Sequence, residues 1–255
     1  MEYLISCNHV NYTYHTLQGE TPALCDIDFQ VKEGEFISIV GPSGCGKSTL
    51  LSLLCGILQP SDGSILFKDE PISEKNRFGI GYMLQHDHLF EWRSVYKNIL
   101  LGLEIQKKLS KETKQEALSL LETYGLSQFK DAKPSQLSGG MRQRAALIRT
   151  LLLHPDLLLL DEPFSALDYQ TRLQVGDDIG SIIRESKKTA ILVTHDLSEA
   201  VSLGDRVIVL NALPASVKAI VPMDFPSDLS PLSRRNTSQF KEYFNLIWKE
   251  LNENG

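Results

Sequence analysis

Two glycine-rich segments of this sequence have the residue types that bind phosphate groups. The first, GPSGCGKST at residues 41–49, fits the pattern G-x-x-x-x-G-K-S/T, in which backbone N–H groups surround nucleotide phosphates. Lys47 would contact the β- and γ-phosphates and Ser48 would ligate Mg²⁺. The second, LSGGM at residues 137–141, precedes a helical pattern, so the Ser138 hydroxyl and free N–H groups would gather at a helix N-terminus, where anions bind. The predicted phosphate contacts are Gly41, Pro42, Ser43, Gly44, Cys45, Gly46, Lys47, Ser48 and Thr49, with Ser138, Gly139 and Gly140.

A third chemical feature is a run of four leucines, residues 157–160, that ends in Asp161 and Glu162. A uniformly apolar run is typical of a parallel strand covered on both faces, and ligands bind at the carboxyl ends of such strands. We expect Asp161 to hold Mg²⁺ and Glu162 to accept a proton from an attacking water. Acids after a strand also occur in ordinary loops, but the phosphate loop in the same chain favours the catalytic interpretation.

Hydrophobic patterning predicts the elements that must position these residues. Residues 25–31 alternate as a half-buried strand, and residues 36–40 read as a buried strand that enters the phosphate loop and then a helix from Lys47 to about Ile57. Further strands are expected at 64–67, 79–84, 157–160, 189–194 and 206–210, and helices at 168–185 and 196–203. This alternation predicts parallel pairing in a layered α/β core.

Helical patterning dominates two other parts of the chain. Residues 92–153 look like a helical insertion, and an apolar face recurs at helical spacing from Phe240 to Leu251. The stretch 211–235 is rich in proline and serine and is predicted to be loop with one short strand near Val217.

Taken in this order, the motifs resemble those of ATP-binding-cassette (ABC) ATPases over nearly the whole chain. The resemblance implies an α/β fold, a P-loop NTPase (RecA-like) core with an antiparallel β subdomain and an inserted α-helical subdomain. It also implies one ABC ATPase domain over 1–255. Within it, 1–88 and 154–222 would form the catalytic core with the β subdomain, 89–153 the helical subdomain with the LSGGM signature, and 223–255 a C-terminal helical tail.

Several single residues take roles only through this resemblance. Gln85 matches the glutamine that contacts Mg²⁺ and links the site to the helical subdomain, and Asp168 matches the last residue of the D-loop, residues 165–168. His195 matches the switch histidine at the γ-phosphate. Tyr14 matches the aromatic residue that stacks on adenine, with Tyr12 as a competitor. The implied cofactors are ATP and Mg²⁺, with Glu162, His195 and Lys47 as catalytic residues and Ser48, Gln85 and Asp161 as metal ligands.

The resemblance also predicts an assembly. In the family, LSGGM faces the phosphate loop of a second cassette, so that two ATP molecules lie between two chains. The expected partners are a second copy or a paralogous cassette, transmembrane permease subunits and, indirectly, a substrate-binding protein.

Composition limits the classes of partner and the location. A net charge of −6 and a pI near 5.6 argue against a dominant nucleic-acid surface. Four cysteines without metal-like pairing indicate free thiols in a reducing cytosol. No secretory signal is recognisable, and no run approaches the roughly 18 apolar residues of a membrane span. We therefore expect a peripheral protein at the cytoplasmic face of the membrane.

Three kinds of cassette compete: an importer subunit, an exporter subunit, and a cassette that acts on DNA or ribosomes. The last is disfavoured by the single cassette and by the lack of a long coiled-coil insertion, and a small-molecule kinase or GTPase is disfavoured because no guanine-reading motif is present. The segments 90–104 and 223–248 resemble importer ATPases of the nitrate/sulfonate/taurine group, although Glu91 stands where a proline commonly precedes the tryptophan. The alternatives are a split exporter or an importer of a pyrimidine- or riboflavin-like vitamin precursor.

Overall fold

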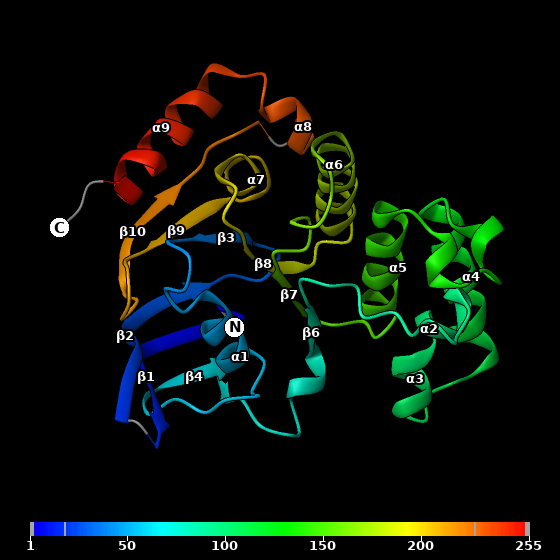
Figure 1. The fold of residues 1–255 in the computed structure, drawn as a ribbon, viewed down its shortest axis with the longest axis horizontal. Helices are drawn as coiled ribbons and strands as arrows, with labels where there is room; N and C mark the ends of the chain where they lie inside the picture. The colour runs from blue at the N-terminus through cyan, green and yellow to red at the C-terminus, as the bar shows by residue number, and fades with distance from the viewer. Residues whose placement is uncertain (1–2, 18, 227, 253–255) are drawn as a thin grey trace.

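Two β-sheets and a separate group of helices make up the computed structural model, which describes residues 3–17, 19–226 and 228–252 (Figure 1). The ends of the predicted domain ranges, at 1–2 and 253–255, lie outside the described residues. Within the described residues, one sheet has four strands in the order β2-β1-β4-β5, and the other has six in the order β10-β9-β3-β8-β7-β6.

The six-stranded sheet carries the ends of the strands that matter for chemistry. Its strands are β3 (Phe36–Val40), β6 (Ile80–Met83), β7 (Leu157–Asp161), β8 (Thr189–Val193), β9 (Arg206–Leu210) and β10 (Val217–Pro222). All neighbouring pairs are parallel except β9 and β10, which are antiparallel. The carboxyl ends of β3, β6, β7 and β8 therefore meet at one edge of the sheet.

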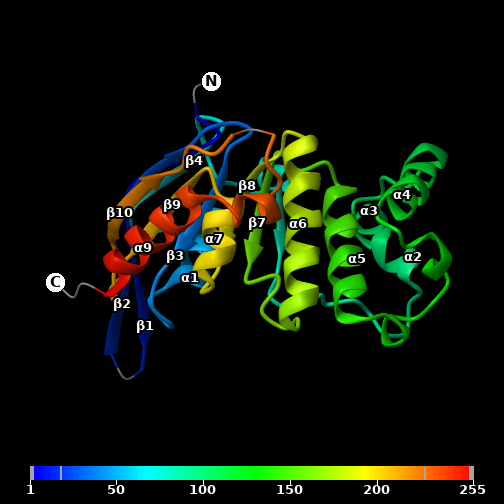
Figure 2. The same cartoon turned by 90° about the horizontal axis from the view of Figure 1, so that it is seen from above.

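Helices bury both faces of this sheet, which explains its uninterrupted apolar strands. Alternate residues such as Leu157 and Leu159 belong to a core shared with α1 (Lys47–Leu54) and the four-stranded sheet. Leu158 and Leu160 face the opposite core, which includes side chains of α6 (Tyr169–Glu185). Figure 2 shows α6 between β7 and the helical group, so this helix covers the sheet on one side and meets the helices on the other.

The four-stranded sheet is antiparallel and supplies the other wall of the first core. Its strands are β1 (Ile5–Thr16), β2 (Gly19–Val31), β4 (Asp62–Phe67) and β5 (Glu70–Pro71). The hydrophobic pattern did not predict β1, because register shifts between Cys7 and Val10 and on to Thr13 interrupt the two-residue alternation.

The helical group has a hydrophobic core of its own, which includes Leu103, Leu121 and Ile148. Its helices are α2 (Val95–Ile99), α3 (Leu101–Ile105), α4 (Lys111–Thr123) and α5 (Gly139–Leu151), all to the right in Figure 1. A capping box of Ser110 and Thr113 begins α4. Single 3₁₀ turns occur at Arg77–Gly79, Ser127–Phe129 and Pro134–Gln136.

The C-terminal segment corrects one prediction. The stretch 211–235 was expected to be loop with one strand, but it also contains the short helix α8 (Pro231–Arg234), capped by Ser230. Four residues are too few to produce a helical period, and buried contacts hold this turn in place: Arg234 donates to the carbonyls of Ser202 and Gly204. The predicted final helix is α9 (Ser238–Asn252), which packs on α7 (Leu197–Leu203) and β9. No helix in the described residues is long and apolar enough to cross a membrane.

Candidate functional site

The phosphate loop joins β3 to α1, as its mechanism requires. Gly44 and Gly46 have φ values of +74° and +115°, a region that favours glycine. Lys47 is only 6% exposed, and its Nζ donates to the carbonyls of Gly41 and Pro42 at 2.8 and 2.9 Å. The ammonium group is thus held against the loop that would surround the phosphates. Burial raises the pKa of the Cys45 thiol, which does not favour a reactive thiolate there.

Asp161, at the end of β7, is hydrogen-bonded by two hydroxyl groups. Ser48 Oγ donates to its Oδ1 at 3.4 Å, and the Tyr82 hydroxyl donates to its Oδ2 at 3.1 Å. Burial raises the pKa of Asp161, and these two bonds oppose that rise. Hydroxyl and carboxylate oxygens are ligands that Mg²⁺ accepts, so Ser48 and Asp161 fit this ion. Sequence reasoning missed Tyr82, because one tyrosine in a strand carries no local signal.

Glu162, Gln85 and His195 come together from three different loops. Glu162 Oε2 lies 3.1 Å from His195 Nδ1 and accepts a hydrogen bond from Gln85 Nε2 at 3.4 Å. Gln85 Nε2 also donates to Ser165 Oγ at 3.2 Å. These loops follow β7, β6 and β8, whose parallel pairing places their carboxyl ends side by side.

The backbone of Glu162 is held in an unusual conformation. Its φ is +44°, which costs a non-glycine residue on the order of 1 kcal/mol, and its N–H donates to the carbonyl of Val193 at 2.8 Å. Strain of this kind persists where the surroundings impose it, and here it aims a carboxylate at the edge where Asp161 ends. The arrangement suits a base that orients a water beside a bound cation.

The two candidate tyrosines in β1 differ in their surroundings. Tyr14 is 40% exposed, and its hydroxyl lies 3.0 Å from Thr49 Oγ1 at the end of the phosphate loop. Tyr12 is partly buried against the first core and meets Tyr14 edge to face at 4.9 Å. Of the two tyrosines, Tyr14 therefore has the more accessible ring beside the phosphate loop.

The structure does not bring LSGGM to the phosphate loop of its own chain. Ser138 caps α5 by accepting from the Met141 N–H at 3.4 Å, and Gly139 and Gly140 form the first turn. Figure 1 shows β6 and β7 between α1 and α5. Across the described part of the chain, no hydrogen bond or ion pair joins residues 137–141 to residues 41–49. Asp168 likewise caps its own helix, α6, by accepting from the Thr171 N–H.

A salt bridge that sequence reasoning missed ties the Gln85 loop to α5. Arg142 donates from Nε and Nη2 to the Asp87 carboxylate at 2.8 and 3.2 Å, and Arg149 donates to the carbonyls of Asp87 and His88. Burial, the largest single influence, acts to raise the pKa of Asp87. The hydrogen bonds from Arg142 and the Leu89 N–H and the charges of Arg142 and Arg149 together outweigh it and hold that pKa below its usual range. Partners this far apart in the sequence leave no local pattern.

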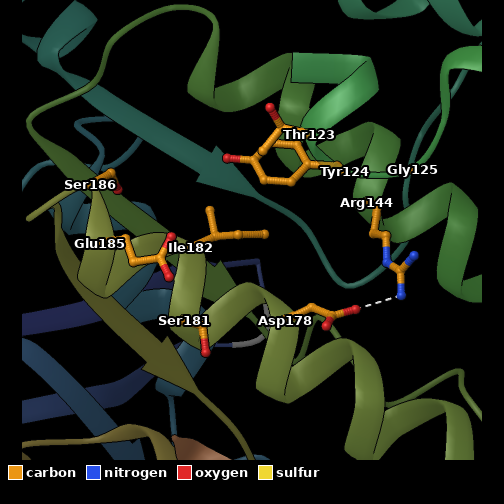
Figure 3. Close-up of a pocket in the computed structure, with 9 residues that line it drawn as sticks. All are labelled: Thr123, Tyr124, Gly125, Arg144, Asp178, Ser181, Ile182, Glu185 and Ser186. Atoms are coloured by element: carbon orange, nitrogen blue, oxygen red, sulfur yellow. Dashed lines mark hydrogen bonds and ion pairs between the residues drawn. The ribbon is translucent and has the colours of Figure 1, made fainter. Parts of the chain in front are cut away.

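A cavity of about 670 Å³ lies where the helical group meets α6 (Figure 3). Tyr124 faces it from the end of α4, Arg144 from α5, and Asp178 and Glu185 from α6. Arg144 Nη2 donates to Asp178 Oδ2 at 2.5 Å across this joint. The cavity is separate from the predicted nucleotide site, because none of its lining residues belongs to that site.

Comparison with known proteins gives one family and close relatives. The model of the ABC transporter family matches residues 24–165. The uncharacterized ABC transporter ATP-binding protein YtlC of Bacillus subtilis is 46% identical over 247 residues, 96% of this chain and 94% of that protein. The aliphatic sulfonates import ATP-binding protein SsuB of Bacillus cereus is 34% identical over 251 residues, 98% of this chain and 97% of that protein.

A solved structure agrees with these matches. The ATP-binding cassette MJ0796, a dimer in a post-hydrolysis state bound to ADP and Pi, superposes with a TM-score of 0.74 at 29% identity. The match covers 87% of this chain and 100% of that one. It confirms the predicted fold class, a P-loop NTPase core with an antiparallel β subdomain and an inserted α-helical subdomain.

Proposed function

This chain belongs to the ABC transporter family as an ATP-binding subunit that hydrolyses ATP, and from that premise we propose that it energises an importer of small anionic solutes. The observation that carries the catalytic part of this proposal is the convergence of Ser48, Asp161, Glu162, Gln85 and His195 at one edge of the sheet. Mg²⁺ bound there would supply positive charge to the phosphates. The chain's own residues hold the nucleotide and orient the attacking water.

We assign each residue one task in hydrolysis. Lys47 and the loop N–H groups bind the β- and γ-phosphates, and Ser48, Asp161 and Gln85 would hold the cation. Glu162 Oε2 accepts the proton of the attacking water, and His195, 3.1 Å from that oxygen, contacts the γ-phosphate and keeps the carboxylate oriented. Tyr14 stacks on the adenine ring.

The active unit in this proposal is a pair of cassettes. The separation of residues 137–141 from the phosphate loop of the same chain supports it, because Ser138 and the N–H groups near Gly140 make no contact with that loop and can face ATP on a second cassette. The dimeric cassette bound to ADP and Pi offers a precedent. Closure on two ATP molecules and reopening after hydrolysis would drive the permease.

The membrane partner would dock beside the Gln85 loop. Phe90 and Trp92 stack with their ring centroids 4.6 Å apart, and they are 38% and 72% exposed. An exposed aromatic pair that follows Gln85 in the chain by five and seven residues suits a permease helix whose movement must reach Gln85. We place the protein at the cytoplasmic face of the membrane, held there by permease subunits and supplied by a substrate-binding protein.

The similarity to SsuB supports import and a cargo of the sulfonate type, within the nitrate/sulfonate/taurine group. Deleting the gene in its host should abolish uptake of a labelled aliphatic sulfonate, and the wild-type gene should restore it. Uptake that is unaffected by the deletion would refute the cargo assignment while leaving ATP hydrolysis untouched.

Glu162→Gln tests the catalytic assignment. The amide preserves the shape of the side chain but cannot take the proton, so we expect ATP binding to persist, a stable ATP-bound dimer to accumulate, and turnover to fall by roughly 10²- to 10⁴-fold. Glu74→Gln is the control, because its side chain is 89% exposed and pairs with Arg77, which is not a residue of the predicted site. Wild-type turnover in Glu162→Gln would overturn the assignment.

A second experiment tests the docking surface. Replacing Phe90 and Trp92 by alanine should leave basal ATP hydrolysis intact and abolish binding to the permease. Trp248→Ala, at a 56% exposed tryptophan on α9, is the matched control. Permease binding unchanged by the double substitution would refute docking at residues 90–92.

A further inference from the structure

Arg172, in the first turn of α6, contacts two catalytic loops at once. Its Nη2 donates to the carbonyl of Leu167 in the D-loop at 3.1 Å. Its Nη1 donates to Asp196 Oδ2 at 3.4 Å, and its Nε lies 3.9 Å from Glu199 Oε1. The planar guanidinium group, with donors in a rigid fork, is suited to such a three-way contact.

The two carboxyl groups that Arg172 reaches hold the residues on both sides of His195. Asp196 follows His195 directly, and its N–H donates to Thr194 Oγ1 at 3.0 Å. Thr194 precedes His195, and its hydroxyl donates to Glu199 Oε2 at 2.6 Å. Asp196 Oδ1 also caps α7 by accepting from the Ser198 N–H at 2.7 Å. The backbone at His195 is therefore held by a network that Arg172 closes.

Burial makes this network stiff. Thr194 and Glu199 are 1% and 4% exposed, so their hydrogen bonds form in a medium of low dielectric constant, where a charged contact is stronger than in water. Burial raises the pKa of Glu199 to about 7. Arg235 of the C-terminal segment lines the same crevice as Arg172 and Glu199, so two guanidinium groups face the carboxylates of Asp196 and Glu199.

We propose that Arg172 is a positioning residue that couples the D-loop to the His195 loop within one subunit. It lies outside the set of residues assigned to ATP and Mg²⁺, and it acts through Asp196 and Glu199. A shift of the Leu167 carbonyl would move the guanidinium group and, with it, the backbone that aims His195 at Glu162. This inference rests on the proposed function, in which His195 contacts the γ-phosphate.

The same helix provides a matched control, Arg184. Its Nη2 donates to the carbonyl of Leu203 and its Nη1 to Asp205 Oδ1 at 2.8 Å. Its side chain is 27% exposed, against 22% for Arg172. Arg184 therefore makes comparable contacts away from His195, and its replacement reports the cost of losing a partly buried arginine from α6.

The first experiment compares Arg172→Met with Arg184→Met in ATP hydrolysis. Misplacing an oriented catalytic group costs roughly ten- to a hundredfold in rate, so we expect kcat of Arg172→Met to fall by that factor while KM for ATP stays within about threefold. Arg184→Met should keep kcat within about twofold. An equal loss of kcat in both variants would overturn the proposal.

Two further variants guard against misfolding and test the pathway. Arg172→Lys keeps the charge but loses the fork, so kcat should fall at least about threefold; a wild-type kcat would overturn the proposal. The double variant Arg172→Met/Asp196→Asn should have a kcat no lower than that of the slower single variant, because the two substitutions break the same linkage. Losses that multiply would show that the two residues act independently and refute the coupling.

A readout without turnover separates this inference from the proposed function. The imidazole resonance of His195, assigned by its loss in His195→Gln, should shift in Arg172→Met and stay in place in Arg184→Met. An unchanged resonance in Arg172→Met overturns the positioning role. Wild-type protein without ATP hydrolysis would instead refute the proposed function, whatever the resonance does.

Discussion

Replacing Gly140 by alanine tests why the LSGGM segment contains glycine. Gly140 is buried in the first turn of α5, where that helix packs on α6. A Cβ at this position would lie 2.9 Å from Val175 Cγ2 and 3.0 Å from Thr171 Cγ2. Both distances are shorter than ordinary carbon–carbon contact, so α5 could sit this close to α6 only with glycine there.

The expected size of the effect follows from two opposing contributions. Overpacking costs about 1–3 kcal/mol, whereas alanine in a helix is favoured over glycine by up to about 1 kcal/mol. The free energy of unfolding of Gly140→Ala should therefore fall by roughly 1 kcal/mol. Gly176→Ala, on the facing helix α6, meets no atom within 4 Å and should instead raise that free energy by about 0.5–1 kcal/mol.

Urea denaturation of both variants measures the difference, and ATP hydrolysis shows its consequence. Alanine keeps the N–H group, so any loss of turnover in Gly140→Ala comes from displacement of α5 and not from a missing phosphate contact. Adding Val175→Ala removes one clashing atom and should recover part of the lost turnover. The packing argument would be refuted if Gly140→Ala were as stable in urea as Gly176→Ala. It would also be refuted if adding Val175→Ala recovered none of the turnover lost in Gly140→Ala.

Three other predictions follow from single contacts. Tyr82→Phe removes a hydrogen bond to Asp161 that is worth about 1.5 kcal/mol. The Mg²⁺ concentration that gives half-maximal ATP hydrolysis should therefore rise about tenfold. An unchanged Mg²⁺ titration would contradict this prediction. Glu199 keeps its proton in the folded state up to about pH 7, so wild-type protein should lose stability as pH rises from about 4.5 to 7. Thermal unfolding measured at a series of pH values should show that Glu199→Gln lacks this pH-dependent loss of stability, which is at most a few kcal/mol. At Gly63, φ is +79° and an added Cβ would clash with the His9 carbonyl, so Gly63→Ala should lower the free energy of unfolding in urea by about 3 kcal/mol or more. Its control is Gly125→Ala, where φ is +70° and the space is open, and the loss should be about 1 kcal/mol.

Local pattern was enough to predict the phosphate loop and the strands that lead to the site. The run 157–160 is apolar because both of its faces are covered, and that burial is visible in the sequence itself. The helix α8 and the bulged strand β1 were missed for the opposite reason: four residues or a shifted register leave no regular period.

The contacts that position the site could not be predicted in the same way. Three of these contacts join residues from separate elements: Asp87 with Arg142, Tyr82 with Asp161, and Arg172 with Asp196. Each depends on the distance and angle between packed elements, which no local pattern encodes.

The sequence by itself determined which groups are present and in what order: a lysine in a glycine-rich loop, acids after a buried strand, and a second Ser-Gly-Gly element before a helix. These follow from short-range rules of turn geometry, strand burial and helix ends. Only the tertiary structure decided which of them meet. Parallel pairing of β6, β7 and β8 brings Gln85, Glu162 and His195 together, while the same sheet keeps residues 137–141 away from the phosphate loop of their own chain.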